Sequence, residues 1–156
     1  MSTMMIRRYQ EKDCEQIEQI FYHTIHTVNV RDYNADQIAA WAPQIPEPNS
    51  WNETLLKNFT IVAEKDGIII GFGDIEYNGY VNRLFVHKEY QGKGVATAIM
   101  NELERFAFEN DIKKVYTAAS ITARPFFEKR GYVVIKQNSI ERRGVFLTNF
   151  SMEKLL

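Results

Sequence analysis

The sequence has one cysteine, Cys14, and no apolar run longer than a few residues. A lone cysteine cannot form an internal disulfide, which fits a reducing compartment. A membrane-spanning helix needs about 20 consecutive apolar residues, so no membrane segment is predicted. Residues 1–7 also lack the apolar core of a signal peptide. From these absences we expect a cytoplasmic protein that makes no contact with a membrane.

The sequence also has no excess of positive or negative charge. Nineteen Lys and Arg face twenty Asp and Glu, and the formal net charge is −1. Nucleic-acid binding usually comes with a clustered basic surface, so we expect no nucleic-acid partner. His23 and His26 have no further ligands nearby in the sequence, and no metal site is predicted. The length of 156 residues fits a single domain, 1–156.

The first third of the chain predicts a short strand followed by helices. Residues 5–9 favour a strand, and Asp13 stands where its carboxylate could cap a helix by accepting from free backbone N–H groups. A second helix is expected from Asn34 or Asp36 to Trp41, and the prolines that follow predict a loop. The first helix should bury the apolar residues that recur at helical spacing: Cys14, Ile17, Ile20, Phe21 and Ile25.

The rest of the chain alternates β-rich and helical segments. Asp66-Gly67 and Asn78-Gly79 separate three β-rich runs, as in an antiparallel meander. A helix and a further strand then imply parallel pairing by a crossover. The expected strands are 59–64, 68–75, 80–86, 115–118, 132–140 and 145–152, and the expected helices are 95–107 and 122–130. The fold predicted is α/β, with a mixed, mostly antiparallel sheet and helices on both faces.

A glycine loop, Gln91-Gly92-Lys93-Gly94, lies between a strand that ends near Val86 and a helix that begins near Val95. Glycine allows positive φ and a close approach of the backbone to a ligand. The first N–H groups of a helix lack internal partners and carry the positive end of its dipole. Such a loop can hold a pyrophosphate, and Lys93 adds a positive charge nearby.

Three nucleotide-binding patterns compete for this loop. A P-loop requires Gly-Lys followed by Ser or Thr, and this loop has no Ser or Thr at that place, because Gly94 and Val95 follow Gly92-Lys93. A dinucleotide fingerprint requires a third glycine, where the sequence has Thr97. The pattern Gln/Arg-x-x-Gly-x-Gly/Ala is matched by Gln91, Gly94 and Ala96.

Two segments together resemble the GNAT family of acetyltransferases. Residues 84–96, LFVHKEYQGKGVA, look like the family's cofactor segment, and residues 123–132, ARPFFEKRGY, are similar to its Ala-x-x-Φ-Tyr-Glu-Lys-x-Gly-Phe stretch. The resemblance covers residues 59–135. It implies splayed central strands, with the pantetheine of acetyl-CoA lying in the gap like an extra strand.

The resemblance also implies a reaction. Acetyl-CoA would be the acyl donor, and a primary amine of a small molecule or peptide would attack it directly in a ternary complex. No Cys or Ser has a recognisable base partner, which argues against a covalent acyl-enzyme. The cofactor-binding residues implied are Leu84, Phe85, Val86, Gln91, Gly92, Lys93, Gly94, Val95, Ala96, Thr97 and Ser120.

The sequence departs from the family at the positions that move protons. Phe127 stands where many members have a tyrosine that protonates the departing thiolate. Ser120, at the end of the preceding strand, could contact pantetheine or assist the thiolate, or it could cap the next helix. Tyr80 stands where histone-modifying members have a glutamate. Strand alternation predicts that Tyr80, Asn82, Leu84 and Val86 share one face, so that the first two point into the acceptor site.

Glu76 is the carboxylate nearest to that position in the sequence. It could deprotonate the amine through water, or it could be a solvated residue at a hairpin end; Asp74 is a weaker candidate. The catalytic residues expected are therefore Glu76, Tyr80 and Ser120. Two alternatives remain open. The protein could be an acyltransferase that uses another acyl-CoA or an oxygen acceptor, or it could be a non-catalytic acyl-CoA-binding module.

The acceptor side is expected in the first helices and the loop after them. Its aromatic residues could form the wall of a pocket or could cover the core. The candidates are the acid Asp32 and the aromatic residues Tyr33, Trp41 and Trp51. The run 143–152 could form a sheet edge that makes a homodimer, or it could simply close the sheet.

Overall fold

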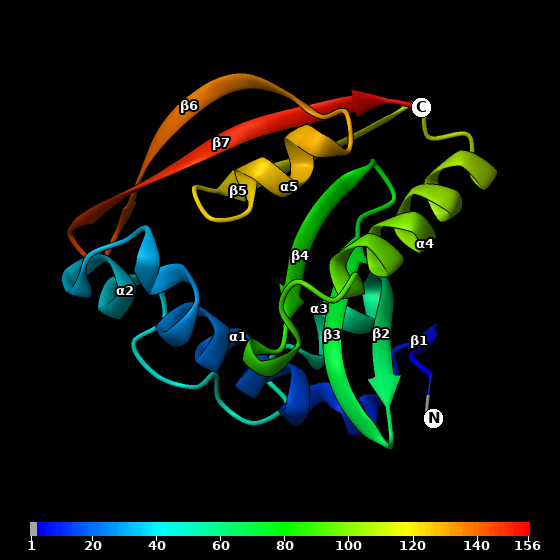
Figure 1. Cartoon of the computed structure of the whole chain (residues 1–156), viewed down its shortest axis with the longest axis horizontal. Coiled ribbons are helices and arrows are strands. Elements are labelled where there is room, and N and C mark those ends of the chain that lie inside the picture. The colour runs from blue at the N-terminus through cyan, green and yellow to red at the C-terminus, as the bar shows by residue number, and fades with distance from the viewer. Residues whose placement is uncertain (1–2) are drawn as a thin grey trace.

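The computed structural model describes residues 3–156, which form one seven-stranded sheet with helices on both faces (Figure 1). The strands are β1 (Met5–Arg8), β2 (Phe59–Lys65), β3 (Ile68–Ile75), β4 (Tyr80–Val86), β5 (Lys114–Ser120), β6 (Val133–Arg142) and β7 (Val145–Leu155). The main helices are α1 (Cys14–Thr27), α2 (Ala35–Trp41), α3 (Asn52–Lys57), α4 (Val95–Glu109) and α5 (Arg124–Lys129). No helix within residues 3–156 has the length and apolarity required to cross a bilayer.

The strand order is β1-β2-β3-β4-β5-β7-β6. Every neighbouring pair is antiparallel except β4 and β5, which are parallel. The parallel pairing is limited to Tyr80 opposite Tyr116 and Val81 opposite Thr117, and the two strands separate beyond it. The predicted fold class and the splayed central strands are confirmed, and this separation is what creates the site.

The two faces of the sheet bury different helices. On one face, α4 contributes Ile99 and Leu103 to a cluster with Ile75 and Val115. A side chain at Gly71 would put its Cβ 2.8 Å from the side chain of Val95, so a glycine is needed where α4 lies on β3. On the other face, α1 and α3 pack on Val62, Ile69 and Phe72. The apolar stripe predicted for α1 is therefore the stripe that the fold buries, with Phe21 partly exposed.

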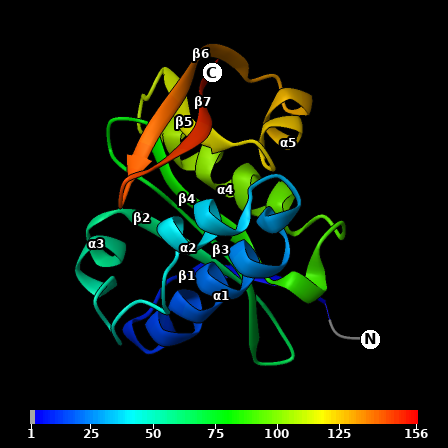
Figure 2. The ribbon, with the colours of Figure 1, turned by 90° about the vertical axis from the view of Figure 1, so that its left-hand side faces the viewer.

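The hairpin of β6 and β7 reaches across to the N-terminal helices (Figures 1 and 2). The Arg143 guanidinium donates to the carbonyl of Ala40 at 2.7 Å, and Gln37 Nε2 donates to the carbonyl of Phe146 at 3.0 Å. Residues about one hundred positions apart in the sequence thus close one end of the molecule. This contact brings β7 and α2 to the same side of the gap between β4 and β5.

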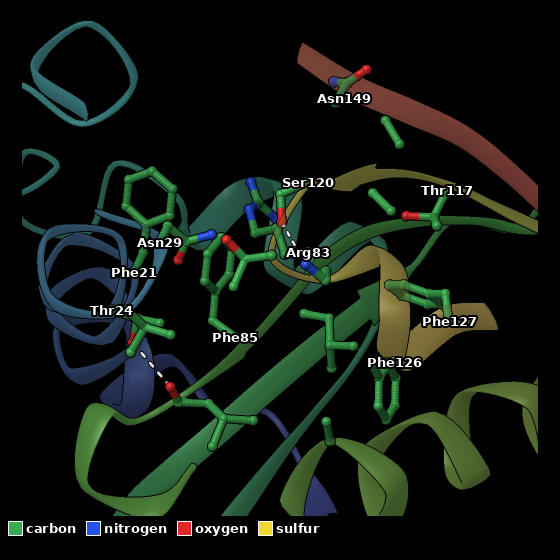
Figure 3. A pocket seen from close by; sticks show the side chains of 18 of the residues that line it. Phe21, Thr24, Asn29, Arg83, Phe85, Thr117, Ser120, Phe126, Phe127 and Asn149 are labelled. Atoms are coloured by element: carbon green, nitrogen blue, oxygen red, sulfur yellow. Dashed lines mark hydrogen bonds between the residues drawn. The ribbon is translucent and has the colours of Figure 1, made fainter. Parts of the chain in front are cut away.

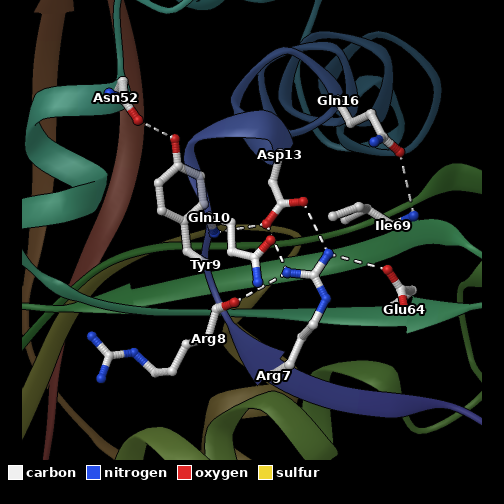
Figure 4. Close-up of polar contacts among 9 residues, drawn as sticks. All are labelled: Arg7, Arg8, Tyr9, Gln10, Asp13, Gln16, Asn52, Glu64 and Ile69. Carbon is white, nitrogen blue, oxygen red and sulfur yellow. Dashed lines mark hydrogen bonds and ion pairs between the residues drawn. The ribbon is translucent and has the colours of Figure 1, made fainter.

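The prediction that Asp13 caps α1 with its side chain is wrong. Its carboxylate accepts from both terminal nitrogens of Arg7 at 2.8 and 2.9 Å and from the Gln10 N–H at 2.8 Å (Figure 4). The reason is a 3₁₀ turn at Glu11–Asp13, which precedes the helix and directs the carboxylate back toward β1. Because Arg7 also pairs with Glu64 at 3.1 Å, the network joins β1, the start of α1 and β2.

Residues 42–51 form the predicted proline-containing loop, but α3, which follows it, was not predicted. The loop is held by Glu18, an α1 residue only 1% exposed. Its carboxylate accepts from the N–H groups of Asn49 at 3.0 Å and Trp51 at 3.1 Å. A buried acid on an apolar helix stripe thus fixes the position of Trp51.

Candidate active site

A cavity of about 610 Å³ occupies the gap between β4 and β5 (Figure 3). Its walls come from both sides of the sheet. The loop before α4 and the residues Phe126 and Phe127 of α5 line one end. The other end, called the acceptor end below, is lined by residues of α1, α2 and the loop 42–51 before α3 (the α3 loop). The cavity therefore passes between the two strands rather than lying on one face.

A bulge in β4 sets the direction of the side chains that line this cavity. Asp74 of β3 pairs with Arg83 and the next residue, Ile75, pairs with Val81, so Asn82 has no partner on β3. An extra residue of this kind interrupts the alternation of a strand. Val81 consequently packs in the same cluster as Leu84 and Val86, beneath α4.

The prediction that Tyr80 and Asn82 share a face with Leu84 and Val86 is therefore wrong. Tyr80 lies on the opposite face, where its ring centroid is 5.1 Å from that of Tyr116. Both Tyr80 and Asn82 still line the cavity, because the bulge stands at the point where β4 leaves β5.

The backbone of β4 offers hydrogen-bonding groups to the gap. The His87 N–H donates to the Ile70 carbonyl at 2.8 Å, which fixes the groups that face β3. Because these directions alternate along a strand, the N–H and C=O of Leu84 and Val86 point into the gap. The carbonyl of Val86 already accepts from Gln91 Nε2 at 2.7 Å and from Thr24 Oγ1 at 3.0 Å (Figure 3). The groups of Leu84 and the N–H of Val86 are left for a ligand.

The glycine loop forms an open cradle at the start of α4. Gly92 and Gly94 have φ of +71° and +81°, and a Cβ built on either would meet nothing within 4 Å. The first backbone hydrogen bond of the helix runs from the Ala98 N–H to the Gly94 carbonyl at 3.1 Å. The N–H groups of residues 91–97 have no acceptor within the described chain. Free N–H groups, the helix dipole and open space fit a pyrophosphate.

The α5 side offers little to move a proton. Phe127 is 2% exposed and packs edge-on against Tyr132, with 5.1 Å between ring centroids. The nearby phenol of Tyr132 donates to Glu104 at 2.7 Å and is not among the residues that line the cavity. Ser120 Oγ accepts from the Ala123 N–H at 3.0 Å, which closes the turn before α5, whereas the N-cap of that helix is Ala123 and not Ser120. Ser120 also lines the cavity, and its hydroxyl proton has no acceptor within residues 3–156.

The other two expected catalytic residues lie at the far end of β4. Tyr80 lines the cavity, and burial, followed by the nearby charge of Glu76, raises the pKa of Tyr80 above its ordinary value. Tyr80 therefore stays protonated near neutral pH and can donate a hydrogen bond. Glu76 lies in the turn before β4, outside the residues that line the cavity, and its N–H donates to the carbonyl of Tyr80 at 2.8 Å.

The acceptor end has aromatic walls. Tyr33, Trp41 and Trp51 line this end, as one of the two interpretations predicted. Asp32 is not among the lining residues, and its carboxylate accepts from the Thr122 hydroxyl at 2.8 Å. The Tyr33 hydroxyl donates to the Thr148 carbonyl at 2.6 Å and accepts from an N–H at the end of β5, so it ties the helical layer to the sheet.

Several lining residues were missed by the sequence analysis: Phe21, Thr24, Asn29, Arg83, Arg142 and Asn149. Asn29 could have been proposed as a site residue, because it is a polar residue just after the amphipathic helix α1. It is 5% exposed, and its side chain has no hydrogen-bond partner within residues 3–156.

Comparisons with known proteins agree with this geometry. Residues 29–154 match a family described as "Acetyltransferase (GNAT) domain". The chain is 39% identical over 153 residues to "Uncharacterized N-acetyltransferase YafP" of Escherichia coli strain K12, covering 97% of this chain and 96% of that protein. It is 29% identical to "Uncharacterized N-acetyltransferase MJ1530" of Methanocaldococcus jannaschii, covering 83% of this chain and 78% of that protein.

Solved structures give the same fold. A GCN5-related N-acetyltransferase from Rhodopseudomonas palustris superposes with a TM-score of 0.93 at 31% identity, covering 100% of this chain and 98% of that one. The PaiA N-acetyltransferase from Thermoplasma acidophilum, solved in complex with coenzyme A, superposes with a TM-score of 0.76 at 20% identity, covering 99% of each chain.

Proposed function

The chain belongs to the GNAT family of acetyltransferases, and on this premise we propose that it moves an acetyl group from acetyl-CoA to a primary amine of a small molecule or peptide. Residues 1–156 would act as one domain, and the transfer would be a direct attack in a ternary complex. The observation that carries the proposal is the single cavity that runs from the glycine cradle, between β4 and β5, to the aromatic walls.

The donor end supports acetyl-CoA. The open cradle at Gly92 and Gly94 suits the pyrophosphate, and the free backbone groups of Leu84 and Val86 suit the pantetheine amides. Relatives of the same fold were solved with coenzyme A or acetyl-CoA, which is consistent with this placement. Lys93, whose Nζ lies 5.4 Å from the centre of the Tyr90 ring, adds a cation at the mouth of the cradle.

The transfer requires one new bond and one broken bond. The uncharged amine nitrogen attacks the thioester carbonyl carbon, the carbon–sulfur bond breaks, and the electron pair leaves on sulfur as a thiolate. One amine proton must be removed, and the sulfur is the final proton acceptor. Holding both reactants in one cavity contributes to rate by orienting them before reaction.

Two hydroxyl groups would stabilise the thiolate. Ser120 has a free hydroxyl proton at the end of β5, and Tyr80 is a protonated phenol at the bulge. Both line the cavity, whereas Phe127 has no proton to give. We assign Glu76 as the base, acting through water beside Tyr80, because its charge already acts on that phenol.

A thiol-release screen tests the function. The protein would be incubated with acetyl-CoA and panels of amines, peptides and alcohols, and free CoA would be measured against time. Acetyl transfer predicts acceptor-dependent release and a product heavier by one acetyl group. Binding of acetyl-CoA without release for any acceptor would support a non-catalytic acyl-CoA-binding role instead. Release with alcohols alone would support the oxygen-acceptor alternative.

A further inference from the structure

The charged side chains in the cavity walls are all positive. Among the described residues that line the cavity, Arg83 and Arg142 carry charge, and no Asp, Glu, Lys or His is present. Arg142 is exposed near the tip of the β6–β7 hairpin, and its guanidinium makes no ion pair within residues 3–156. A polycationic acceptor would find no counter-charge in such walls, whereas an anionic group would find two guanidinium groups, one of which, that of Arg83, already has an acidic partner behind it.

Arg83 is held in the cavity by a buried acid. Its Nη1 lies 2.7 Å from Asp74 Oδ2, and the side chains are 14% and 0% exposed. Asn58 Nδ2 donates to the same oxygen at 3.0 Å. Asp74 Oδ1 is the one fully buried side-chain polar atom of residues 3–156 that has no hydrogen-bond partner. A buried carboxylate with an unsatisfied oxygen destabilises the fold, so its presence calls for a role beyond packing.

Trp51 fixes the plane of the same guanidinium. Arg83 Cζ lies 4.4 Å from the centre of the Trp51 ring, and that ring meets Phe21 edge-on at 4.7 Å between centroids. The backbone of Trp51 is in turn held by the buried Glu18. Asp74 holds one edge of the guanidinium and Trp51 packs against its face, so the group has little conformational freedom. A group held in this way loses little entropy when it binds a ligand.

Most of the hydrogen-bonding capacity of Arg83 is unused. A guanidinium has five N–H donors. One nitrogen donates to Asp74, Nη2 reaches Thr54 Oγ1 only at 3.4 Å, and Nε has no partner within residues 3–156. Arg83 lines the aromatic end of the cavity with Phe21 and Phe85 (Figure 3), and Trp51 lines the same end. A planar carboxylate matches the planar fork of the remaining donors.

Another ion cluster of the molecule shows what a structural role looks like. Glu104 accepts from Arg130 at 2.9 Å, Tyr132 at 2.7 Å and Lys154 at 3.1 Å, so its donors and acceptors are paired. Neither Arg130 nor Lys154 lines the cavity. Arg83 differs because it is anchored on one side and open to the cavity on the other.

We propose that Arg83 selects acceptors that carry an anionic group, a carboxylate, in addition to the reacting amine, and that Asp74 and Trp51 are positioning residues for it. The inference rests on the proposed acetyl transfer and names its substrate class. The aromatic walls further suit an acceptor with an aromatic or apolar body. An amine of this class is an aromatic amino acid or a short peptide with a free carboxylate.

Matched acceptors test the proposal on the unaltered protein. Phenylalanine, phenylalaninamide and phenethylamine share one aromatic body, and only the first carries a carboxylate. We expect kcat/KM for phenylalanine to exceed that for the amide by roughly 10- to 100-fold, the range for a charge-assisted hydrogen bond. The amide has the less basic amine, so without anion recognition it would be the better substrate. The phosphonate analogue of phenylalanine, compared in parallel, distinguishes a carboxylate from other anions.

A paired substitution isolates Arg83. Arg83→Gln together with Asp74→Asn removes both charges, so neither is left buried alone, and the melting temperature reports whether the fold survives. We expect the preference for the acid to fall to about 1, mainly through a higher KM, with acetyl-CoA affinity unchanged. Arg130→Gln, which removes an arginine outside the cavity, should keep the preference.

The outcomes separate the two proposals. Equal use of the acid and the amide, or an equal loss for both in the paired variant, would refute anion recognition while leaving acetyl transfer intact. If no amine is acetylated although acetyl-CoA binds, the proposed function fails. Calorimetry of the acid and the amide with the CoA-loaded protein then decides anion recognition: tighter binding of the acid, lost in the paired variant, supports it, and equal binding refutes it.

Discussion

The side chain of Gln91 donates a hydrogen bond of 2.7 Å from Nε2 to the carbonyl of Val86, which ties the glycine loop to the end of β4. Thr24 of α1 donates to the same carbonyl at 3.0 Å. One backbone oxygen therefore joins the loop, the strand and the helix on the other face. The glutamine of the loop pattern has a structural reason here, because it holds the cradle in register with the backbone groups of β4.

Replacing Gln91 by methionine keeps the length of the side chain and removes the donor. We expect acetyl-CoA to bind about 5-fold more weakly, since a hydrogen bond of this kind is worth about 1 kcal/mol. Calorimetric titration with acetyl-CoA measures the change. Gln19→Met, an exposed substitution on α1, is the control and should leave the affinity unaltered. Unchanged affinity in the Gln91 variant would contradict the role given to this bond.

Replacing Gly94 by valine should abolish acetyl-CoA binding. The backbone at Gly94 has a φ of +81°, which valine tolerates poorly, and its side chain would enter the open cradle. Gly67→Val is a matched control, because Gly67 has a φ of +76°, also faces open space, and lies in the turn between β2 and β3. The control should lose similar stability in thermal melts and keep its affinity. Equal loss of affinity in both variants would show that backbone strain alone is responsible.

The parts of the fold that depend on local pattern could be predicted from the sequence. The apolar stripe of α1, the position of α4, the turns at Gly67 and Gly79, and the glycine loop follow from spacing and from residue types that tolerate positive φ. Two separate motifs in the expected order made the resemblance to the family specific. These features involve residues close together in the chain, where physical preferences act directly.

The features that could not be predicted depend on contacts distant in sequence. The β4 bulge at Asn82 is a property of the pairing with β3, and it reversed the face expected for Tyr80. Asp13 contacts Arg7 because the chain turns before α1, where local preference favoured a cap. The lining of the acceptor end was only partly foreseen, since α1, the α3 loop and β7 meet there through tertiary packing.

Asp13→Asn should destabilise the fold by about 2–3 kcal/mol at neutral pH, because it removes the buried carboxylate that pairs with Arg7 and leaves Glu64 as the one charged partner of this guanidinium among residues 3–156. Burial opposes the shift, but the hydrogen bonds from Arg7 and the Gln10 N–H lower the pKa of Asp13 below its usual value. The stabilisation is therefore present above about pH 4 and is lost as pH falls through the lowered pKa. Urea unfolding of both proteins from pH 7 to pH 2 should show the difference shrinking. Glu15→Gln, an exposed acid on α1, is the charge-matched control and should show little change at any pH.

Tyr80→Phe should lower kcat by roughly 10- to 100-fold with little change in the KM for acetyl-CoA. The reason is the proposed role of the phenol as a donor to the departing thiolate, in which the glycine loop and not Tyr80 binds the donor. The raised pKa of Tyr80 keeps its proton in place through neutral pH, so the wild-type rate should not fall until the pH exceeds about 10 on account of this group. Tyr77→Phe is the matched control, since Tyr77 is 62% exposed in the turn beside it. If Tyr80→Phe retains full kcat while Ser120→Ala loses it, the thiolate is stabilised by the serine, and the assignment of the phenol is wrong.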